Sequence, residues 1–284
     1  MLSSVVPFFT VLMPWEFSPT LALVCAFFGI CYARGSRQAA IQGDLNFWRN
    51  LSFWSGLLII YAVLQTHFDY YAQHMFWIHR LQHLILHHIG PFLLILSYPG
   101  KNLLLGLPQP LQKKMLVLQY HPVLKKIYAL MQMPLLAAIL FVGVIFFWLA
   151  PQIHLIAMLN YKLYNIMNWS MVVDGLLFWR IILDARSPLN SNSLSYNKRL
   201  FLLWLIMPPQ IILGAYIALS TIEIYSVYDI CGRAWSMSPI VDQRYAGLMT
   251  WIPASMMSAI AALVVIRLWR QQYHLRSLTQ ESAT

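Results

Sequence analysis

Charged residues are scarce in this sequence, and their scarcity decides the class of the protein. Asp, Glu, Lys and Arg make up only 10% of the 284 residues, whereas hydrophobic residues make up 60%. A soluble globular chain has roughly 25% charged and about 45–50% apolar residues, so a soluble fold is excluded. Apolar runs of about 20 residues match the hydrocarbon thickness of a bilayer. The composition therefore predicts an integral membrane protein.

The motifs of several enzyme classes are missing as well. The sequence has no G-x-S-x-G, H-E-x-x-H or phosphate-loop pattern, which mark serine hydrolases, zinc peptidases and nucleotide-binding proteins. Its three cysteines give no zinc spacing, and Cys25 and Cys31 would lie about 9 Å apart along a helix, too far for a disulfide. We therefore expect a protein that is not an enzyme.

Basic residues are absent from the first thirty positions, so the positive region that begins a cleavable signal peptide is missing. The first apolar segment is expected to remain as a membrane anchor. Because lipid cannot hydrogen-bond to the backbone, every apolar segment should be helical. We predict an all-α, polytopic bundle forming a single transmembrane domain over residues 1–284, with about seven spans. These cover roughly residues 14–33, 45–66, 74–97, 127–149, 159–183, 200–222 and 243–268.

Lys and Arg residues are distributed unequally between the loops. Fifteen of the nineteen follow the first, third, fifth or seventh predicted span, and only three fall on the opposite side. Basic loops face the cytoplasm, so the amino terminus is predicted to lie outside and the carboxyl terminus in the cytoplasm. This topology also explains the net charge of +10. We therefore expect lipid contacts and no nucleic-acid binding.

Histidines are concentrated in the stretch "HRLQHLILHH", residues 79–88 of the third predicted span. His79, His83 and His87 are spaced by four residues and would share one helical face, rising about 12 Å in total. His88 would point about 100° away from His87. Ionisable groups inside a membrane are functional candidates, and imidazole is the commonest metal-binding side chain. We predict that the stripe binds a metal, although each histidine alone is compatible with a hydrogen bond to a neighbouring helix.

Two further histidines are expected near the outer end of this stripe. His74 begins the third predicted span, and His154, the weaker metal candidate, precedes the fifth. Fourteen methionines are present, among them Met167 and Met171 in the fifth span. Their thioethers suit Cu(I), as imidazoles suit copper or haem iron, but Met is also a common apolar filler.

Acidic and basic residues that accompany the stripe are expected to support it. Asp174 lies thirteen residues into its span, as His87 does, so the two are predicted to form a carboxylate–imidazole pair. Arg80 is expected to reach the outer interface or to pair with an outer acid such as Asp69. Asp242 and Gln243 begin the seventh span at the outer face. There Asp242 either caps its own helix or attracts a cation to the mouth of the stripe.

Three segments together resemble a known family. "HRLQHLILHHIGPFLLILSYP" resembles the pattern H-M-x-Q-H-x-L-L-x-x-x-x-P-P-L-L-x-L-G-x-P of the CtaG family of caa3-type cytochrome c oxidase assembly factors. "VDQRYAGLMTWIP" is similar to its D-Q-x-x-A-G-L-x-M-W-x-P signature, and "GLLFW" (175–179) to its fifth span. The chain departs from the pattern at Arg80 and Phe92. Tyr164 and Asn168 also stand where a second pair of histidines is expected.

The resemblance implies a multi-pass protein of the bacterial cytoplasmic membrane that assists assembly of a haem–copper oxidase. Its partners would be oxidase subunits or other assembly factors. Our physical interpretation is that the histidine stripe passes copper inward from the outer face. Two alternatives stay open. One is an electron-transfer protein with haem b between His154 and either His79 or His83. The other is a metal-free scaffold for oxidase subunits.

Overall fold

The computed structural model describes residues 13–41, 43, 46–118, 120–186 and 193–281, and every named element in this part of the chain is a helix. The all-α prediction is therefore confirmed for the described residues. The structure contains four helices long and apolar enough to cross a membrane, or up to six if two bent pairs each count as one span. The four are α2 (Pro19–Ile41), α3 (Phe47–Gln65), α13 (Tyr196–Leu219) and α15 (Pro239–Glu281).

Two bent pairs and one polar helix account for the other predicted spans. Residues Phe76–Leu96 turn by 76° into α7 (Gly100–Gly106), and α9 (Pro122–Met131) turns by 69° into α10 (Pro134–Leu149). The span predicted at 159–183 is occupied by α12 (Tyr161–Ile182), which is not among the long apolar candidates. Lys, Asp and Arg side chains within α12 make it more polar than its neighbours. The length and composition of the described helices therefore support four to six spans and do not establish the predicted seven.

Helix boundaries differ from the prediction at the first span, and also at the seventh, where α15 extends beyond the predicted 243–268 at both ends. The predicted segment was 14–33, but α2 runs from Pro19 to Ile41. Pro19 suits the first helical position because its missing N–H has no intrahelical partner there, and the Ser18 hydroxyl accepts a hydrogen bond from Leu21 N at 3.4 Å. The polar residues after position 33 continue the helix, because hydropathy marks the membrane and not the helix end.

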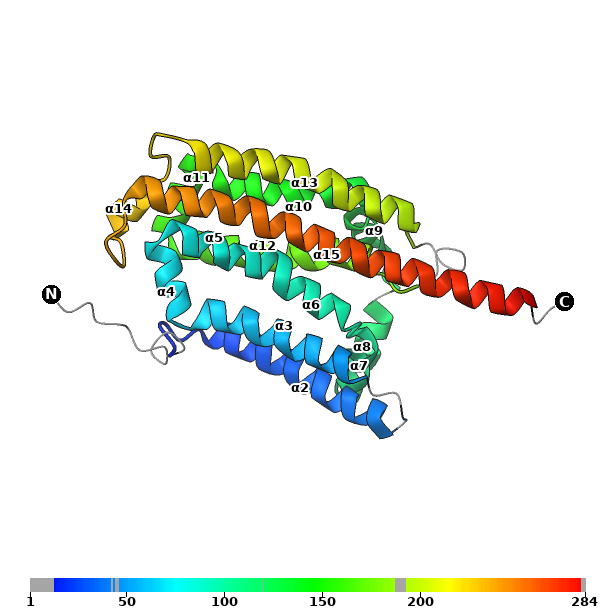
Figure 1. Ribbon diagram of the computed structural model, residues 1–284. Coiled ribbons are helices and arrows are strands. Elements are labelled where there is room, and N and C mark those ends of the chain that lie inside the picture. The colour runs from blue at the N-terminus through cyan, green and yellow to red at the C-terminus, as the bar shows by residue number, and fades with distance from the viewer. Residues whose placement is uncertain (1–12, 42, 44–45, 119, 187–192, 282–284) are drawn as a thin grey trace.

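The long helices lie along a common axis as a bundle (Figure 1). The pair α13 and α15 forms one side and α2 with α3 forms the other, while α5 and α6 run between them. At the α13–α15 contact, a Cβ on Gly247 would lie 2.6 Å from the Gly214 carbonyl oxygen. Only glycine allows these backbones to approach so closely.

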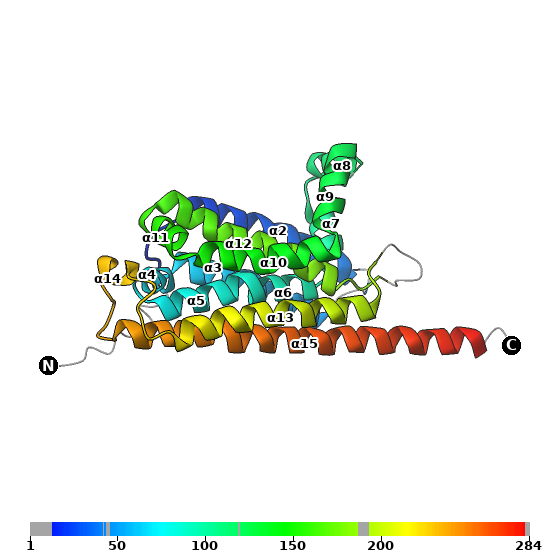
Figure 2. The same ribbon diagram turned by 90° about the horizontal axis from the view of Figure 1, so that it is seen from above.

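Short helices cover the two ends of the bundle. At one end lie α4 (His67–His74), α11 (Pro151–Leu159) and α14 (Val227–Cys231), and at the other lie α7, α8 (Gln109–Leu118) and α9. Figure 2 shows α7, α8 and α9 standing across the bundle direction. The start of α2 and the end of α15 lie at opposite ends. This arrangement agrees with termini on opposite sides of a membrane, but does not say which side is cytoplasmic.

The histidine-rich segment is a broken helix at the centre of the bundle. It consists of α5 (Phe76–Leu84), the π-helical turn η1 (Ile85–Ile89) and α6 (Gly90–Leu96). A π turn inserts an extra residue into the helix and frequently marks a functional site. Against it packs α12, where a Cβ on Gly175 would lie 2.4 Å from the His87 carbonyl oxygen. Trp179 of α12 donates its indole N–H to the same oxygen at 3.2 Å.

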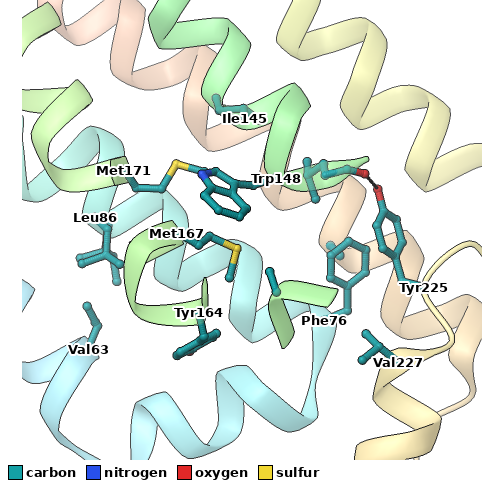
Figure 3. Close-up of a cluster of buried hydrophobic side chains, with 14 of the residues drawn as sticks. Val63, Phe76, Leu86, Ile145, Trp148, Tyr164, Met167, Met171, Tyr225 and Val227 are labelled. Atoms are coloured by element: carbon teal, nitrogen blue, oxygen red, sulfur yellow. Dashed lines mark hydrogen bonds between the residues drawn. The ribbon is translucent and has the colours of Figure 1, made fainter. Parts of the chain in front are cut away.

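Apolar side chains close the core around this helix. Figure 3 shows Met167 and Met171 of α12 in one buried cluster with Trp148, Tyr164 and Leu86. Both methionine side chains are fully buried. The bundle interior at this level is therefore lined by sulfur and aromatic rings as well as by imidazoles.

Candidate functional site

Five histidines from two helical segments lie in the interior of the bundle. His79, His83, His87 and His88 belong to the α5–η1 segment and His154 to α11, and none is more than 3% exposed. Burying an imidazole is costly unless hydrogen bonds replace its contacts with water. The partners of each ring nitrogen therefore indicate what each histidine is able to do.

The outer group, which is named after the predicted topology, consists of His79, His83 and His154. The ring of His79 lies 4.2 Å from that of His83 and 5.1 Å from that of His154. His154 is tied down by two contacts, because Nδ1 lies 3.0 Å from the Trp148 carbonyl and Nε2 lies 3.0 Å from the Tyr228 hydroxyl. Neither ring nitrogen of His79 makes a hydrogen bond of good geometry. His79 is thus the member of this group whose ring nitrogens are least engaged, although the Ala72 backbone carbonyl lies near its ring.

His83 has no free nitrogen, because Arg80 and Asn168 occupy both sides of its ring. Arg80 Nη1 donates to His83 Nδ1 at 3.3 Å, and His83 Nε2 donates to Asn168 Oδ1 at 3.2 Å. Asn168, from α12, orients His83 across the helix interface through its amide oxygen. In the observed conformation, a metal bound by His83 would have to displace one of these partners.

Arg80 lies inside the bundle, and the expectation that it reaches the interface or pairs with Asp69 is wrong. It is 4% exposed and its Nε donates to Thr250 Oγ1 at 2.9 Å. In the described part of the chain, no carboxylate forms an ion pair with it. The Thr250 hydroxyl and the His83 ring supply acceptors in the interior, so the side chain turns inward.

Asp69, on α4 at the outer end, has different partners. Its carboxylate accepts hydrogen bonds from Tyr164 Oη at 2.7 Å, Gln82 Nε2 at 2.7 Å and Gln73 Nε2 at 2.8 Å. Burial raises the pKa of the Asp69 carboxyl, and these hydrogen bonds partly offset the rise. Tyr164 thus links α12 to α4 and to the Gln82 side chain.

The inner group consists of His87 and His88, whose rings lie 4.9 Å apart. His87 Nε2 lies 3.0 Å from Asp174 Oδ2, so the predicted carboxylate–imidazole contact is present in the structure. His88 Nε2 lies 3.2 Å from Gln210 Oε1. The Nδ1 atoms of both rings are buried without a hydrogen-bond partner.

The π turn changes the stripe expected from a regular helix. The prediction placed His79, His83 and His87 on one face with His88 pointing away. The structure instead has two groups, because η1 interrupts the fourfold spacing and buries both His87 and His88. The described residues show no ring contact between His83 and either of them. The π turn has no sequence signal that we recognised.

Asp242 and Gln243 hold the outer ends of helices together. Asp242 accepts hydrogen bonds from the backbone N–H groups of Phe76 at 3.0 Å and Trp77 at 2.9 Å, and it also pairs with Arg233. Asp242 therefore caps the start of the neighbouring α5. The prediction was that it would cap its own helix or attract a cation. Gln243 accepts from Ile224 N at 2.7 Å and fastens the preceding loop.

His74 lies apart from both groups. Its Nδ1 is 2.7 Å from the Tyr70 carbonyl, and its ring packs on the Tyr70 ring at 4.1 Å. These local contacts within α4 give it no direct part in the buried cluster.

The donor set fits a soft ion better than a metal with a full ligand shell. Within the described residues, no three His, Cys, Asp or Glu side chains are placed to hold one ion. Buried polar atoms without partners are rare in folded proteins, yet His79, His87 and His88 all carry one or two. Imidazole and thioether donors suit copper. The cluster therefore offers nitrogen donors to an ion that accepts few ligands.

A haem does not fit between the histidines. The outer rings are in contact with one another, so no space for a porphyrin separates His154 from His79 or His83. The cavity bordered by His83, His87 and His88 has a free volume of about 10 Å³, which corresponds to about one water molecule. Small-molecule sites are typically about 300–1,000 Å³.

Comparison with known proteins connects this site to oxidase assembly. Residues 29–272 match the family described as cytochrome c oxidase caa3 assembly factor. The chain is 24% identical over 284 residues to an uncharacterized protein of Mycobacterium leprae, covering 95% of this chain and 41% of that protein. Uncharacterized proteins of Mycobacterium bovis and Mycobacterium tuberculosis are each 24% identical over 275 residues, covering 92% of this chain and 40% of theirs. The chain thus spans about two-fifths of these relatives. No solved structure matches.

Proposed function

Because the chain belongs to the family of cytochrome c oxidase caa3 assembly factors, we propose that it delivers copper to a haem–copper oxidase through its buried histidines. Copper is the cargo in this proposal and not a permanent cofactor. The family suggests a non-catalytic role in assembly. The copper step is our extension of it to the residues of this chain.

The observation that carries the proposal is the set of buried imidazole nitrogens without partners. His79 has two such atoms, and His87 and His88 have one each. Leaving a buried polar atom unpaired costs about 1–3 kcal/mol, so a bound ion would recover stabilisation that the metal-free protein lacks. A purely structural histidine would be expected to have satisfied ring nitrogens, as those of His154 are.

The proposed path leads from the outer group to the inner group. An ion entering from the end of the bundle that carries α4, α11 and α14 would meet His79 first. It would then exchange ligands past His83, where Arg80 and Asn168 must yield, and reach His87 and His88. The ion would move by exchanging one ligand for the next, and its oxidation state would not change. The orientation of this path follows the predicted topology, with α4, α11 and α14 outside and the long end of α15 in the cytoplasm.

The proposed partners are oxidase subunits, or other assembly factors, in a bacterial cytoplasmic membrane. Large apolar side chains are exposed along α2, α13 and α15, where lipid or a partner helix would cover them. The outer face is the side from which we expect oxidase copper sites to be loaded.

The test is the metal content of the partner oxidase in cells that lack this protein and are complemented with variants. His79→Ala and His87→Ala should each yield oxidase with normal subunit levels but reduced copper. His121→Ala is the matched control, because His121 is an exposed histidine outside the cluster and its loss should change nothing. Normal copper in all variants would refute the proposal.

A metal-free scaffold is the second candidate. The lack of any three-ligand group among the described residues favours it. Under this alternative, deleting the whole chain would lower oxidase subunit levels, whereas the histidine variants would leave both subunits and copper unchanged.

A further inference from the structure

Two neighbouring histidines in η1 share an arrangement that no other pair in the described core has. Each ring uses Nε2 for a partner on another helix and leaves Nδ1 buried without one. His87 uses Asp174 of α12, and His88 uses Gln210 of α13. The two rings are thus fixed by two different helices, with 4.9 Å between their centres.

The hydrogen bonds decide which nitrogen keeps a lone pair. Gln210 Nε2 donates to the Ile206 carbonyl at 3.0 Å, which turns Oε1 towards His88 as an acceptor. His88 Nε2 must therefore carry the proton. When Asp174 is ionised, its carboxylate imposes the same assignment on His87. In both rings Nδ1 is the basic nitrogen, ready to bind a metal ion without releasing a proton.

A small cavity lies beside both rings. Its lining includes His87, His88, Met171 and Met249, and its free space of about 10 Å³ corresponds to about one water-sized sphere. Met171 comes from α12 and is fully buried, as Figure 3 shows among its apolar neighbours. Imidazole nitrogen with thioether sulfur is a donor set that suits Cu(I). A site of this size excludes a hydrated ion.

Charge also distinguishes the inner pair from the outer group. Arg80 donates directly to His83 and borders the cavity, so its guanidinium opposes a cation nearby. At the inner pair, Asp174 supplies the opposite charge through His87. A carboxylate on the far nitrogen also raises the basicity of the ligating one. Because Arg80 borders the same cavity as His87 and His88, the ionised Asp174 carboxylate offsets its charge for a singly charged ion at His87.

We infer that His87 and His88 bind one Cu(I) ion through their Nδ1 atoms, with Met171 or Met249 as a thioether neighbour. This inference rests on the proposed copper function and assigns the resting position of the cargo. Binding forms two Cu–N bonds from existing lone pairs. No electron is transferred, and the added positive charge is balanced by Asp174.

The first test measures Cu(I) affinity of the full-length chain in detergent, under anaerobic conditions, in competition with bicinchoninate. We expect His88→Gln and His87→Gln each to weaken binding by at least about tenfold, because loss of a second-shell partner alone costs about 10–100-fold. Asp174→Asn keeps an acceptor oxygen but removes the charge and should weaken binding about 10-fold. His121→Gln is the matched control, because it removes an exposed histidine outside the cluster, and it should retain tight binding. His79→Gln, which removes the entry ligand, tests the outer group separately.

X-ray absorption of the Cu(I)-loaded wild-type chain supplies evidence that does not depend on folded variants. The inference predicts two imidazole nitrogens in the copper shell, and it predicts that any sulfur contribution weakens in Met171→Leu or Met249→Leu. A shell without imidazole would overturn it.

The outcomes separate this inference from the function on which it rests. Copper binding lost in His79→Gln but kept in His87→Gln and His88→Gln would overturn the inner site and leave copper delivery standing. No Cu(I) binding by wild-type protein would overturn both. Loss in the inner variants alone, with unchanged elution and melting temperature, supports the inner site.

Discussion

Asp242→Asn is expected to destabilise the bundle, because Asp242 joins two helices and a loop at one buried point. The carboxylate is 0% exposed, accepts the backbone N–H groups of Phe76 and Trp77, and pairs with Arg233. Breaking a buried ion pair costs about 3–5 kcal/mol. Arg233 keeps Asp229 as a partner and the amide oxygen still accepts one N–H, so we expect a loss of about 2–3 kcal/mol.

The control is Asp229→Asn, which removes the i, i+4 partner of Arg233. Asp229 is 45% exposed, and exposed ion pairs contribute only about 0–1 kcal/mol. Reversible unfolding in mixed detergent and SDS micelles, followed by circular dichroism, measures both variants. The reasoning fails if Asp242→Asn loses no more free energy of unfolding than Asp229→Asn. It also fails if oxidase maturation is lost while the stability of Asp242→Asn is unchanged, because the charge would then serve a partner or an ion.

Three further predictions address topology, packing and pH. Reporter fusions after residues 110 and 192 should report the cytoplasm and fusions near 70 and 230 the outside; a cytoplasmic signal at 230 would contradict the predicted orientation. Gly175→Val should disrupt the α12–η1 contact and lower the yield of folded protein, because its Cβ would meet the His87 carbonyl at 2.4 Å, whereas Gly143→Ala, with open space around it, should not. Burial raises the pKa of Asp69 in the folded protein. Asp69 therefore stabilises the folded state at low pH, and this stabilisation is lost as the pH rises through the folded-state pKa. The melting temperature of the wild type minus that of Asp69→Asn should therefore rise as the pH is lowered from 7 to about 4. Parallel pH profiles of the two proteins would count against this assignment.

The sequence was sufficient for the features that depend on composition and regular spacing. Long apolar runs predicted an all-α protein, and the resemblance of three segments to the CtaG family is confirmed by the match over residues 29–272. The depth argument that placed Asp174 beside His87 also holds in the structure. It succeeded because helix rise per residue is constant, so equal distances from the outer ends give equal depths.

Features that depend on tertiary contacts were missed. The π turn at Ile85–Ile89 moves His87 and His88 relative to His83, and no local pattern specifies such an insertion. Arg80 was expected at the interface, but Thr250 lies 170 positions further along the chain and provides the buried acceptor. Gln210 was not singled out at all. A polar residue directly after the Pro208–Pro209 pair in an apolar helix was the available signal.

The central claim is that the buried histidines hold copper, and the most direct measurement is copper per chain in protein purified anaerobically from copper-replete cells. Elemental analysis of the wild type should detect bound copper, because imidazole and thioether donors suit it, and the His87→Ala/His88→Ala double variant, purified in parallel and equally monodisperse, should give almost none. No copper in the wild type would contradict the claim, and equal copper in the two proteins would contradict its placement at His87 and His88.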